Sequence, residues 1–311
     1  LVIHPPWDES NGVYDLYYCT NLISPAWQWL LRTEAGQTNV TVANATNAQG
    51  FYQIRPPDDL AANDSLGTNF WLAFFYMDYD GANNLSLAIS SPMGATGEVI
   101  IPQLSMTNDF TVAAGAVTNI SVPNWIMMFD NEYDEVGNNG IQVIADALVS
   151  VYGLDYDAAA SAAFTGYPTP LLGTNYCLIT RAGENSSFNS ELGVLATEDD
   201  TTVTIIPSTT ADLWDRDTGL THSNAYTEVL QRGQTYQVNS RRDDAGVLTN
   251  DVTGTWVTAD KPVAVFAGAD LADIPDNKTQ YGNPLMQEQM PVADWGKEAL
   301  ALSFAGRLKG D

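Results

Sequence analysis

A set of short β-type blocks occurs twice along this chain in the same order, and this repetition restricts the possible folds more than any other feature. Each copy opens with Gly-Thr-Asn and an aromatic residue, and each closes with a Val-rich run that contains an Ala-Asp pair. Five blocks that recur in one order indicate an internal duplication. We therefore expect two halves that share one topology. The first copy comprises residues 67–70, 85–90, 94–102, 114–115 and 140–153, and the second comprises 173–176, 192–197, 199–207, 232–233 and 254–268.

The local residue pattern is that of strands. Apolar positions alternate with a period of two, and Gly, Pro, Asn and Asp separate the β-branched runs. The pattern predicts an all-β fold of tandem β-sandwich modules, Ig-like or jelly-roll-like, with an internal duplication. The closing block of each copy is expected to turn at its Ala-Asp pair and to end at Gly153 or Gly268. Only the Ala-rich segment 155–164 has helical character.

The length of 311 residues corresponds to roughly two to three domains. We predict a small N-terminal β module over 1–55, a linker with Pro and Asp over 56–65, and β-sandwich repeats over 66–170 and 171–311. No signal peptide precedes Leu1, so we expect that an export signal has been removed or that the chain is a fragment. Within the small module, the expected strands are 13–19, 27–32, 39–43 and 50–54.

Charge restricts the possible partners. The chain has 12 Lys and Arg against 38 Asp and Glu, a formal net charge of -26, which repels nucleic acids and anionic membrane surfaces. Cations and basic proteins are the expected counter-charges, although acidic surfaces also keep exported proteins soluble. No apolar run approaches the roughly 18 residues that would span a membrane. Cys19 and Cys177 each fall in a predicted strand and are expected to be buried thiols.

Two acidic loops are candidate Ca²⁺ sites, because Ca²⁺ takes about six to eight oxygen ligands and a loop rich in carboxylates and amides can supply them. Their spacing is not that of an EF-hand. Acidic residues in solvated turns give the same pattern, so both interpretations stay open, and Ca²⁺ is the one cofactor that the sequence indicates. The candidate ligands are Asp130, Glu132, Asp134, Glu135 and Asn138 in one loop, and Asp78, Asp80 and Asn83 in the other.

The N-terminal module is rich in aromatic residues. Tyr17, Trp27 and Trp29 are candidates for stacking on a glycan. However, Trp27 and Trp29 alternate as one face of a strand, and a module of about 55 residues needs large aromatic side chains to form any core. Core packing is therefore the favoured interpretation.

No catalytic pattern stands out. His4 and His222 are the only histidines, and no nucleophile elbow, zinc-protease motif or phosphate-binding glycine loop is present. The acidic residues contain many possible carboxylate pairs for a polysaccharide hydrolase, but nothing singles out one pair. We therefore expect no catalytic residues.

Several of the blocks resemble the N-terminal domain family of IgGFc-binding proteins over roughly residues 65–304. The opening segment NGVYDLYYCTNL also looks like a small β module of bacterial exported proteins, which favours a bacterial source. The family resemblance implies a domain of large secreted or surface proteins with adhesive or matrix roles and no assigned catalytic residues. The blocks that carry it include GTNFWLAF at 67–74, NNGIQVIADALVSVYG at 138–153, LATEDDTTVTIIPS at 195–208, ADKPVAVFAG at 259–268 and EQMPVADWGKE at 288–298.

The leading functional hypothesis is a non-enzymatic, extracellular structural or adhesive module of a bacterial cell surface. Such a module would self-associate or belong to a larger surface protein, filament or layer, with other protein subunits or surface glycans as partners. Neither nucleic acid binding nor membrane insertion is expected. The second hypothesis is a carbohydrate-binding module that uses the N-terminal aromatic residues, and the third is a polysaccharide hydrolase.

Overall fold

The structure, a computed structural model, describes residues 2–3, 15–19, 28–32, 40–41, 51–55, 65–76, 84–128, 134–156, 160–183, 188–209, 211–241, 251–272 and 282–296. The chain divides into two compact units, residues 1–64 and 65–311. All regular elements of the described residues are β-strands and short 3-10 turns, so the predicted all-β fold is confirmed. None of these residues form a helix that is long and apolar enough for a membrane crossing.

The N-terminal unit contains a three-stranded antiparallel sheet with the order β3-β2-β5. Its central strand buries Leu16, and the rings of Tyr18 and Tyr52 lie 5.2 Å apart on neighbouring strands. A second, two-stranded pair joins β1 to β4. The strands are β1 (Val2–Ile3), β2 (Asp15–Cys19), β3 (Gln28–Arg32), β4 (Val40–Thr41) and β5 (Phe51–Arg55).

The first half of the larger unit forms a 7-stranded sheet around β12, with the order β10-β7-β12-β8-β9 and with β6 and β13 also paired to β12. The early part of β12 pairs with β6 and β8, and its late part pairs with β7 and β13, so one strand passes from one layer of the sandwich to the other. The end strands β9 and β10 also touch, which nearly closes the sheet into a barrel. The strands are β6 (Gly67–Leu72), β7 (Asn84–Ser91), β8 (Ala95–Ile101), β9 (Met106–Val112), β10 (Ala116–Val122), β12 (Ile141–Tyr156) and β13 (Ser161–Gly166).

The second half forms an 8-stranded sheet around β21, with the order β11-β20-β15-β21-β16-β19 and with β14 and β22 also paired to β21. A small hairpin, β17 (Trp214–Asp215) with β18 (Leu220–Thr221), is inserted between β16 and β19. The 3-10 turns of the unit are η1 (Pro102–Leu104), η2 (Asn124–Ile126), η3 (Thr169–Leu171) and η4 (Val292–Asp294). The strands are β11 (Asp134–Gly137), β14 (Gly173–Cys177), β15 (Ser190–Ala196), β16 (Thr201–Ile206), β19 (Tyr226–Leu230), β20 (Thr235–Asn239), β21 (Trp256–Ala272) and β22 (Asn283–Glu288).

The two halves have the same topology, which confirms the duplication. The order β9-β8-β12-β7-β10 of the first half is repeated as β19-β16-β21-β15-β20 in the second. Even single hydrogen bonds recur. Asp146 accepts bonds from the backbone N and Oγ1 of Thr96, both at 2.7 Å, and Asp260 accepts one from the backbone N of Thr202 at 2.8 Å.

The structure aligns one repeated block differently from the sequence. Matching 94–102 with 199–207 aligns Ile101 with Ile206, yet Ile101 is buried and Ile206 is 42% exposed. Val99 pairs with Val143 in the first half, and Ile205 pairs with Val257, the residue equivalent to Val143, in the second. Val99 therefore corresponds to Ile205, one residue later than the match of the two blocks places it. A shift of one reverses the face of every side chain in a strand, so burial decides the alignment.

Four local predictions are wrong. The Ala-Asp pairs lie inside the continuous strands β12 and β21, where the strands change layers, and not in turns. Gly153 and Gly268 also lie within these strands, and a Cβ added to Gly153 would lie 2.2 Å from the Phe164 ring, so its role is close packing. Segment 155–164 is strand at both described ends, because a helix this short is marginal without packing of its own. Cys177 is a free thiol that is half-buried and not buried.

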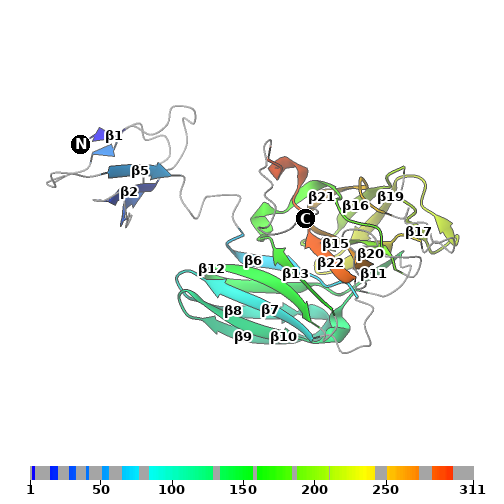
Figure 1. Cartoon of the computed structure of the whole chain (residues 1–311), viewed down its shortest axis with the longest axis horizontal. Helices are drawn as coiled ribbons and strands as arrows, with labels where there is room; N and C mark the ends of the chain where they lie inside the picture. Colours follow the sequence, from blue (N-terminus) through cyan, green and yellow to red (C-terminus); the bar gives the residue numbers. More distant parts are fainter. Residues whose placement is uncertain are drawn as a thin grey trace, which may run out of the picture. The chain divides into compact units, whose positions relative to one another are not determined.

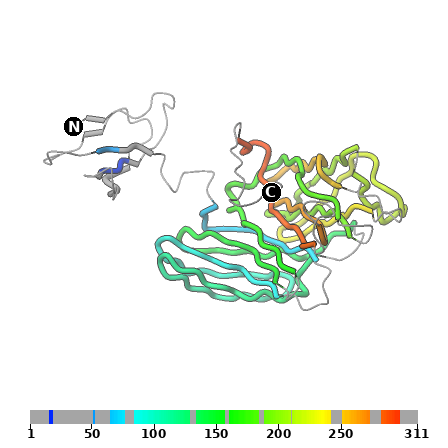
Figure 2. Tube along the Cα trace, in the orientation of Figure 1, coloured from blue at the N-terminus to red at the C-terminus, as the bar shows by residue number. Residues whose placement is uncertain are grey.

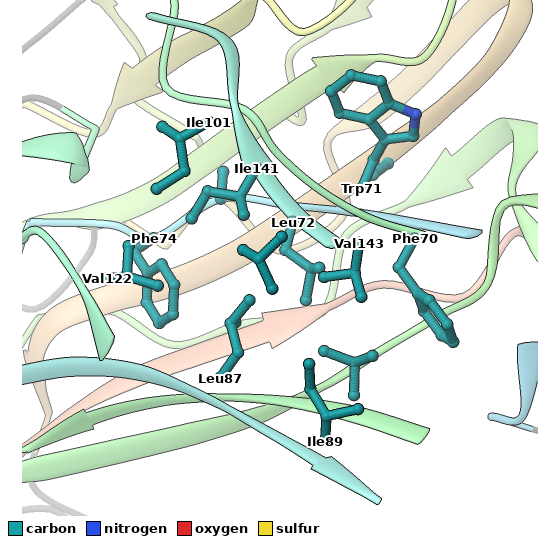
Figure 3. Packing of buried hydrophobic residues seen from close by; sticks show 14 of the residues in the cluster. Phe70, Trp71, Leu72, Phe74, Leu87, Ile89, Ile101, Val122, Ile141 and Val143 are labelled. Atoms are coloured by element: carbon teal, nitrogen blue, oxygen red, sulfur yellow. The ribbon is translucent and has the colours of Figure 1, made fainter. Parts of the chain in front are cut away.

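One hydrophobic core joins the two halves. Most of its residues come from the first half, including those labelled in Figure 3, but Leu195, Ala264 and Phe266 of the second half belong to the same cluster. Phe164 links them, with its ring 5.4 Å from that of Phe74 and 5.8 Å from that of Phe266. A second cluster fills the second half alone. The two halves lie against each other in the Cα trace of Figure 2.

A strand also crosses between the halves. Strand β11 lies between β10 and β12 in the sequence, yet it pairs with β20 of the second sheet, from Asp134 opposite Val238 to Gly137 opposite Thr235 (Figure 1). The contact continues where the backbone N of Gly140 donates to the carbonyl of Gly233 at 3.2 Å. The predicted domain limits remain predictions, but the two sheets are bound together by both a core and a hydrogen-bonded ladder.

Candidate metal centre

The crossing strand β11 brings an acidic side chain next to the inserted hairpin of the second half. Asp134 opens β11, Asp215 ends β17, and His222 directly follows β18. In the first half, β8 leads to β9 through η1 and a single further residue, so this insertion has no counterpart there. The cluster therefore combines one residue from the first half with two from a segment that only the second half has.

His222 lies between the two carboxylates. Its Nε2 is 2.8 Å from Oδ2 of Asp134, and its Nδ1 is 4.0 Å from Oδ2 of Asp215. The three side chains are 12–19% exposed, so water still reaches them. The imidazole is stacked on the ring of Tyr226, with the centroids 3.8 Å apart and the planes at 13°.

Other groups hold the second oxygen of each carboxylate. The Tyr236 hydroxyl donates to Oδ1 of Asp134, and the backbone N of Asp217 and of Thr218 donate to Oδ1 of Asp215, both at 3.1 Å. Since Tyr236 has one proton, Tyr226 supplies the proton of the 3.0 Å bond between the two hydroxyls. The Oδ2 atoms of Asp134 and Asp215 face His222. The backbone N of Arg216 also donates to Oδ2 of Asp134 at 3.2 Å.

The surroundings of the cluster favour the charged form of Asp215 and the protonated form of the two phenols. Hydrogen bonds from Thr218 lower the pKa of Asp215, and the nearby His222 lowers it further. Burial raises the pKa of both Tyr226 and Tyr236. Burial and the nearby Asp134 also raise the pKa of Glu228. The two tyrosines therefore act as hydrogen-bond donors at neutral pH.

This set of groups could hold a metal ion, because one ligand atom from each of Asp134, Asp215 and His222 lies within 4.8 Å of the others. Zinc accepts imidazole nitrogen and carboxylate oxygen at about 2.0–2.2 Å, and many sites use three protein ligands with a fourth position open. Calcium prefers six to eight oxygen atoms, which these residues do not provide. Metal-binding carboxylates in proteins are commonly oriented by hydrogen bonds to the oxygen that does not bind the metal, as the bonds to the two Oδ1 atoms would do here.

The predicted Ca²⁺ ligands are only partly within the described residues. Asp134 belongs to the cluster above. Glu135 accepts a hydrogen bond from Nη1 of Arg216 at 2.5 Å, and Oδ1 of Asn138 accepts one from Gln234 at 3.3 Å. The remaining candidates lie outside the described residues, so Ca²⁺ binding by these loops stays a prediction. They are Asp130, Glu132, Asp78, Asp80 and Asn83.

The predicted glycan residues lie in the N-terminal unit. Tyr17 is half-buried in β2 and is paired with Trp29 of β3 and with Gln53 of β5. Trp27 lies outside the described residues. Glycan binding therefore remains a prediction.

The sequence does not indicate Asp215 and His222 as partners of Asp134. His222 stands out there only as one of two histidines, and 88 positions separate it from Asp134. The one local signal was Asp-Thr-Gly at 217–219, which is typical of a hairpin turn and places Asp215 and His222 at its two ends. Nothing in the sequence indicated that β11 would cross to this hairpin.

Comparison with protein families supports the resemblance. The model of the family described as IgGFc binding protein matches residues 162–311, from β13 to the end of the chain, whereas the similar blocks before residue 162 lie outside the match. Comparisons with curated proteins and with solved structures give no match. Residues 162–311, a little under half of the chain, are therefore similar to the IgGFc-binding protein family.

Proposed function

We propose that the chain is a non-enzymatic, extracellular structural or adhesive module of a larger surface assembly. The observation that supports this most is the crossing of β11, which pairs in the second sheet although its neighbours in sequence belong to the first. The halves cannot separate without breaking this ladder and exposing Phe266 and Ala264 to water. A unit locked in this way is suited to transmit force between its ends.

The charge and the family agree with this role. A net charge of -26 keeps neighbouring copies soluble at high local density and favours cations or basic partners. The edges of antiparallel sheets offer backbone groups to which a further strand can add. Secretion, a bacterial source and self-association are parts of this proposal.

Single-molecule pulling of the full chain between its ends tests the mechanical role. Residues 65–311 should unfold as one event that releases about 800 Å of chain, at most about 3.3–3.6 Å per residue. Two separate events, each of about half that length, would show that the halves do not act together and would refute the proposal. Light scattering with and without Ca²⁺ then tests whether copies associate, and a monomer under all conditions removes self-association.

The identity of the cation also belongs to the proposal. We favour a zinc-like ion for Asp134, Asp215 and His222, because an imidazole nitrogen and two carboxylates match its preferred ligands. Ca²⁺ remains the proposal for the two acidic loops identified from the sequence. Chelator-treated protein titrated with each ion in turn distinguishes the two sites.

A carbohydrate-binding role is the second candidate, since Tyr17 is only half-buried. A glycan array probed with the wild-type chain and with Trp29→Ala tests it. Binding that is lost while the N-terminal unit stays folded supports a glycan site. Loss of folding together with binding indicates that Trp29 is a core residue.

A further inference from the structure

A cavity of about 600 Å³ opens at the seam between the two halves. Tyr167 directly follows β13, Glu288 is the last residue of β22, and Met290 lies two residues beyond it. The lining also includes Ile179, Asp294 and Trp295. Trp295 is 44% exposed and Ile179 is 63% exposed, so large apolar groups lie at the surface beside the cavity.

Glu288 is the unusual member of this lining. Its side chain is only 1% exposed. Oε2 accepts a hydrogen bond from the backbone N of Tyr167 at 2.9 Å, across the seam, but Oε1 is buried and has no partner among the described residues. An unsatisfied buried carboxylate oxygen costs free energy, and most buried polar atoms in proteins have a partner. A ligand with a hydrogen-bond donor would remove this cost.

The surroundings of Glu288 indicate which donor. A second carboxylate, Asp294, lines the cavity, and none of the described lining residues is Lys, Arg or His. Tyr167 and Trp295 present aromatic rings, which attract cations to their faces. Met290 and Ile179 provide apolar surface for a hydrocarbon stem. The chain as a whole carries a net charge of -26, which also attracts a cation.

We propose that this cavity binds the side chain of a lysine from a protein partner, with its ammonium group at Glu288 and its four-carbon stem against Met290 and Ile179. The ammonium has three donors, which suffice for Oε1 of Glu288 and for the carboxylate of Asp294. This site is independent of the structural role proposed above.

Binding should release a proton. Burial raises the pKa of Glu288 well above its ordinary value, so the free protein favours the protonated carboxyl group. A bound ammonium favours the carboxylate, and the proton leaves to solvent as the ion pair forms. Affinity should therefore rise with pH until Glu288 ionises without the ligand. A neutral ligand that binds by hydrogen bonds alone would lack this dependence.

Titration calorimetry of the full chain tests the proposal with Nα-acetyl-lysine-N-methylamide as the probe. Its Nε-acetylated form and the norleucine analogue have the same stem without the charge, and both should bind at least about tenfold more weakly. Butylammonium tests whether a free amine suffices, and methyl β-glucoside tests a neutral polyol. Equal binding of the charged and uncharged probes overturns the proposal. Binding of the glucoside or butylammonium with no binding of the lysine probe overturns it too.

Two variants locate the site. Glu288→Gln preserves the size of the side chain and should weaken lysine binding by at least about tenfold and abolish its pH dependence. Asp294→Asn should weaken binding less, since that side chain is half-buried and remains hydrated. Glu228→Gln, a partly buried glutamate in β19, is the matched control and should leave affinity unchanged. Wild-type affinity in folded Glu288→Gln, checked by circular dichroism, refutes the assignment, and Asp294→Asn provides the same test if Glu288→Gln does not fold.

Discussion

Tyr152 and Phe266 occupy the same place in the two halves, yet their environments differ completely. Tyr152 of β12 lies opposite Ala88 of β7, and Phe266 of β21 lies opposite Gly193 of β15. Tyr152 is 39% exposed, whereas Phe266 is fully buried in the core of the first half. The outer face of the second sheet has thus become an interface, while the outer face of the first sheet still meets water. Duplication preserved the pairing of strands but not the environment of their faces.

The same contrast extends along the neighbouring strands. In β7 alternate residues are buried, as expected for a sheet with one wet face, but all seven residues of β15 are buried. Strands β10 and β20 differ in the same way. Part of the second buried face is polar: Gln237 donates to Glu191 at 3.2 Å and to Asn239 at 3.0 Å. The polar residues that alternation assigns to solvent have instead formed an internal network.

Replacement of the residue at the interface should have the largest effect. Phe266→Ala should lower the free energy of unfolding by about 3–5 kcal/mol, since it removes a buried ring from the shared core. Tyr152→Ala, the matched change in the first half, should cost much less because that ring is partly exposed. Urea denaturation of both variants measures the difference. Equal losses would mean that the two faces are energetically alike.

Metal binding should stabilise the folded chain at the site that includes the β17–β18 insertion, which the first half lacks. If Asp134, Asp215 and His222 bind zinc, free ion at 100 times its Kd should stabilise the protein by about 2.7 kcal/mol. Thermal melts with Zn²⁺ or Ca²⁺ after chelator treatment show which ion acts. His222→Gln should remove the zinc effect, and Asp260→Asn, a carboxylate in β21, should preserve it. A zinc effect that survives in His222→Gln places the ion elsewhere.

A methyl group added to β15 should disturb the interface. A Cβ at Gly193 would lie 2.8 Å from Cε of Met128 and 2.9 Å from Cε1 of Phe75, so Gly193→Ala should cost about 1–3 kcal/mol. The counterpart in β7 is Ala88, which already has a Cβ. Ala88→Gly should lower the free energy of unfolding by about 0.5–1 kcal/mol through backbone entropy alone. Chemical denaturation measures both. A neutral or stabilising Gly193→Ala would show that Met128 and Phe75 move aside freely.

The pH dependence of stability should differ between the wild type and Glu288→Gln. The position equivalent to Glu288 in β13 is Thr165, which does not titrate. Above pH 4.5 the unfolded chain ionises at Glu288 while the folded chain keeps its proton, because burial raises the folded pKa. Stability should therefore fall as pH rises, by at most about 1.4 kcal/mol per pH unit, until the folded group ionises. Melting curves from pH 4 to 9 should be flatter for Glu288→Gln; parallel curves would contradict this.

The smallest effects are expected at the twin aspartates. Asp146→Asn and Asp260→Asn each weaken hydrogen bonds to the threonine of the neighbouring strand, and both should lower the melting temperature slightly and by similar amounts. The bonds from Thr96 lower the pKa of Asp146, so its contribution is complete above pH 3.8 and is lost as pH falls through the lower folded pKa. Calorimetry at pH 7 and near pH 3 measures this. A large difference between the two variants would show that the shared geometry conceals unequal roles.

The sequence predicted those features that repeat or alternate. The recurring blocks predicted one topology for both halves, and the alternation around Val149 and Val263 predicted the faces of the long strands that point into the cores. It could not predict that Phe266 would be buried on the opposite face, because that depends on contacts with Phe164 of the other half. His222 and Asp134 likewise meet only through the crossing of β11. Features that depend on contacts between the halves leave no local pattern in the sequence.

The crossing of β11 also has a consequence for biogenesis. During synthesis β11 emerges about one hundred residues before its partner β20, since Asp134 bonds to a residue 102 positions later. Strand β11 must therefore wait until β20 has been made before the two strands can pair. Pairing between segments this distant in the sequence raises the contact order and slows folding. Premature folding of the amino-terminal half alone would leave a free edge that neighbouring chains could capture.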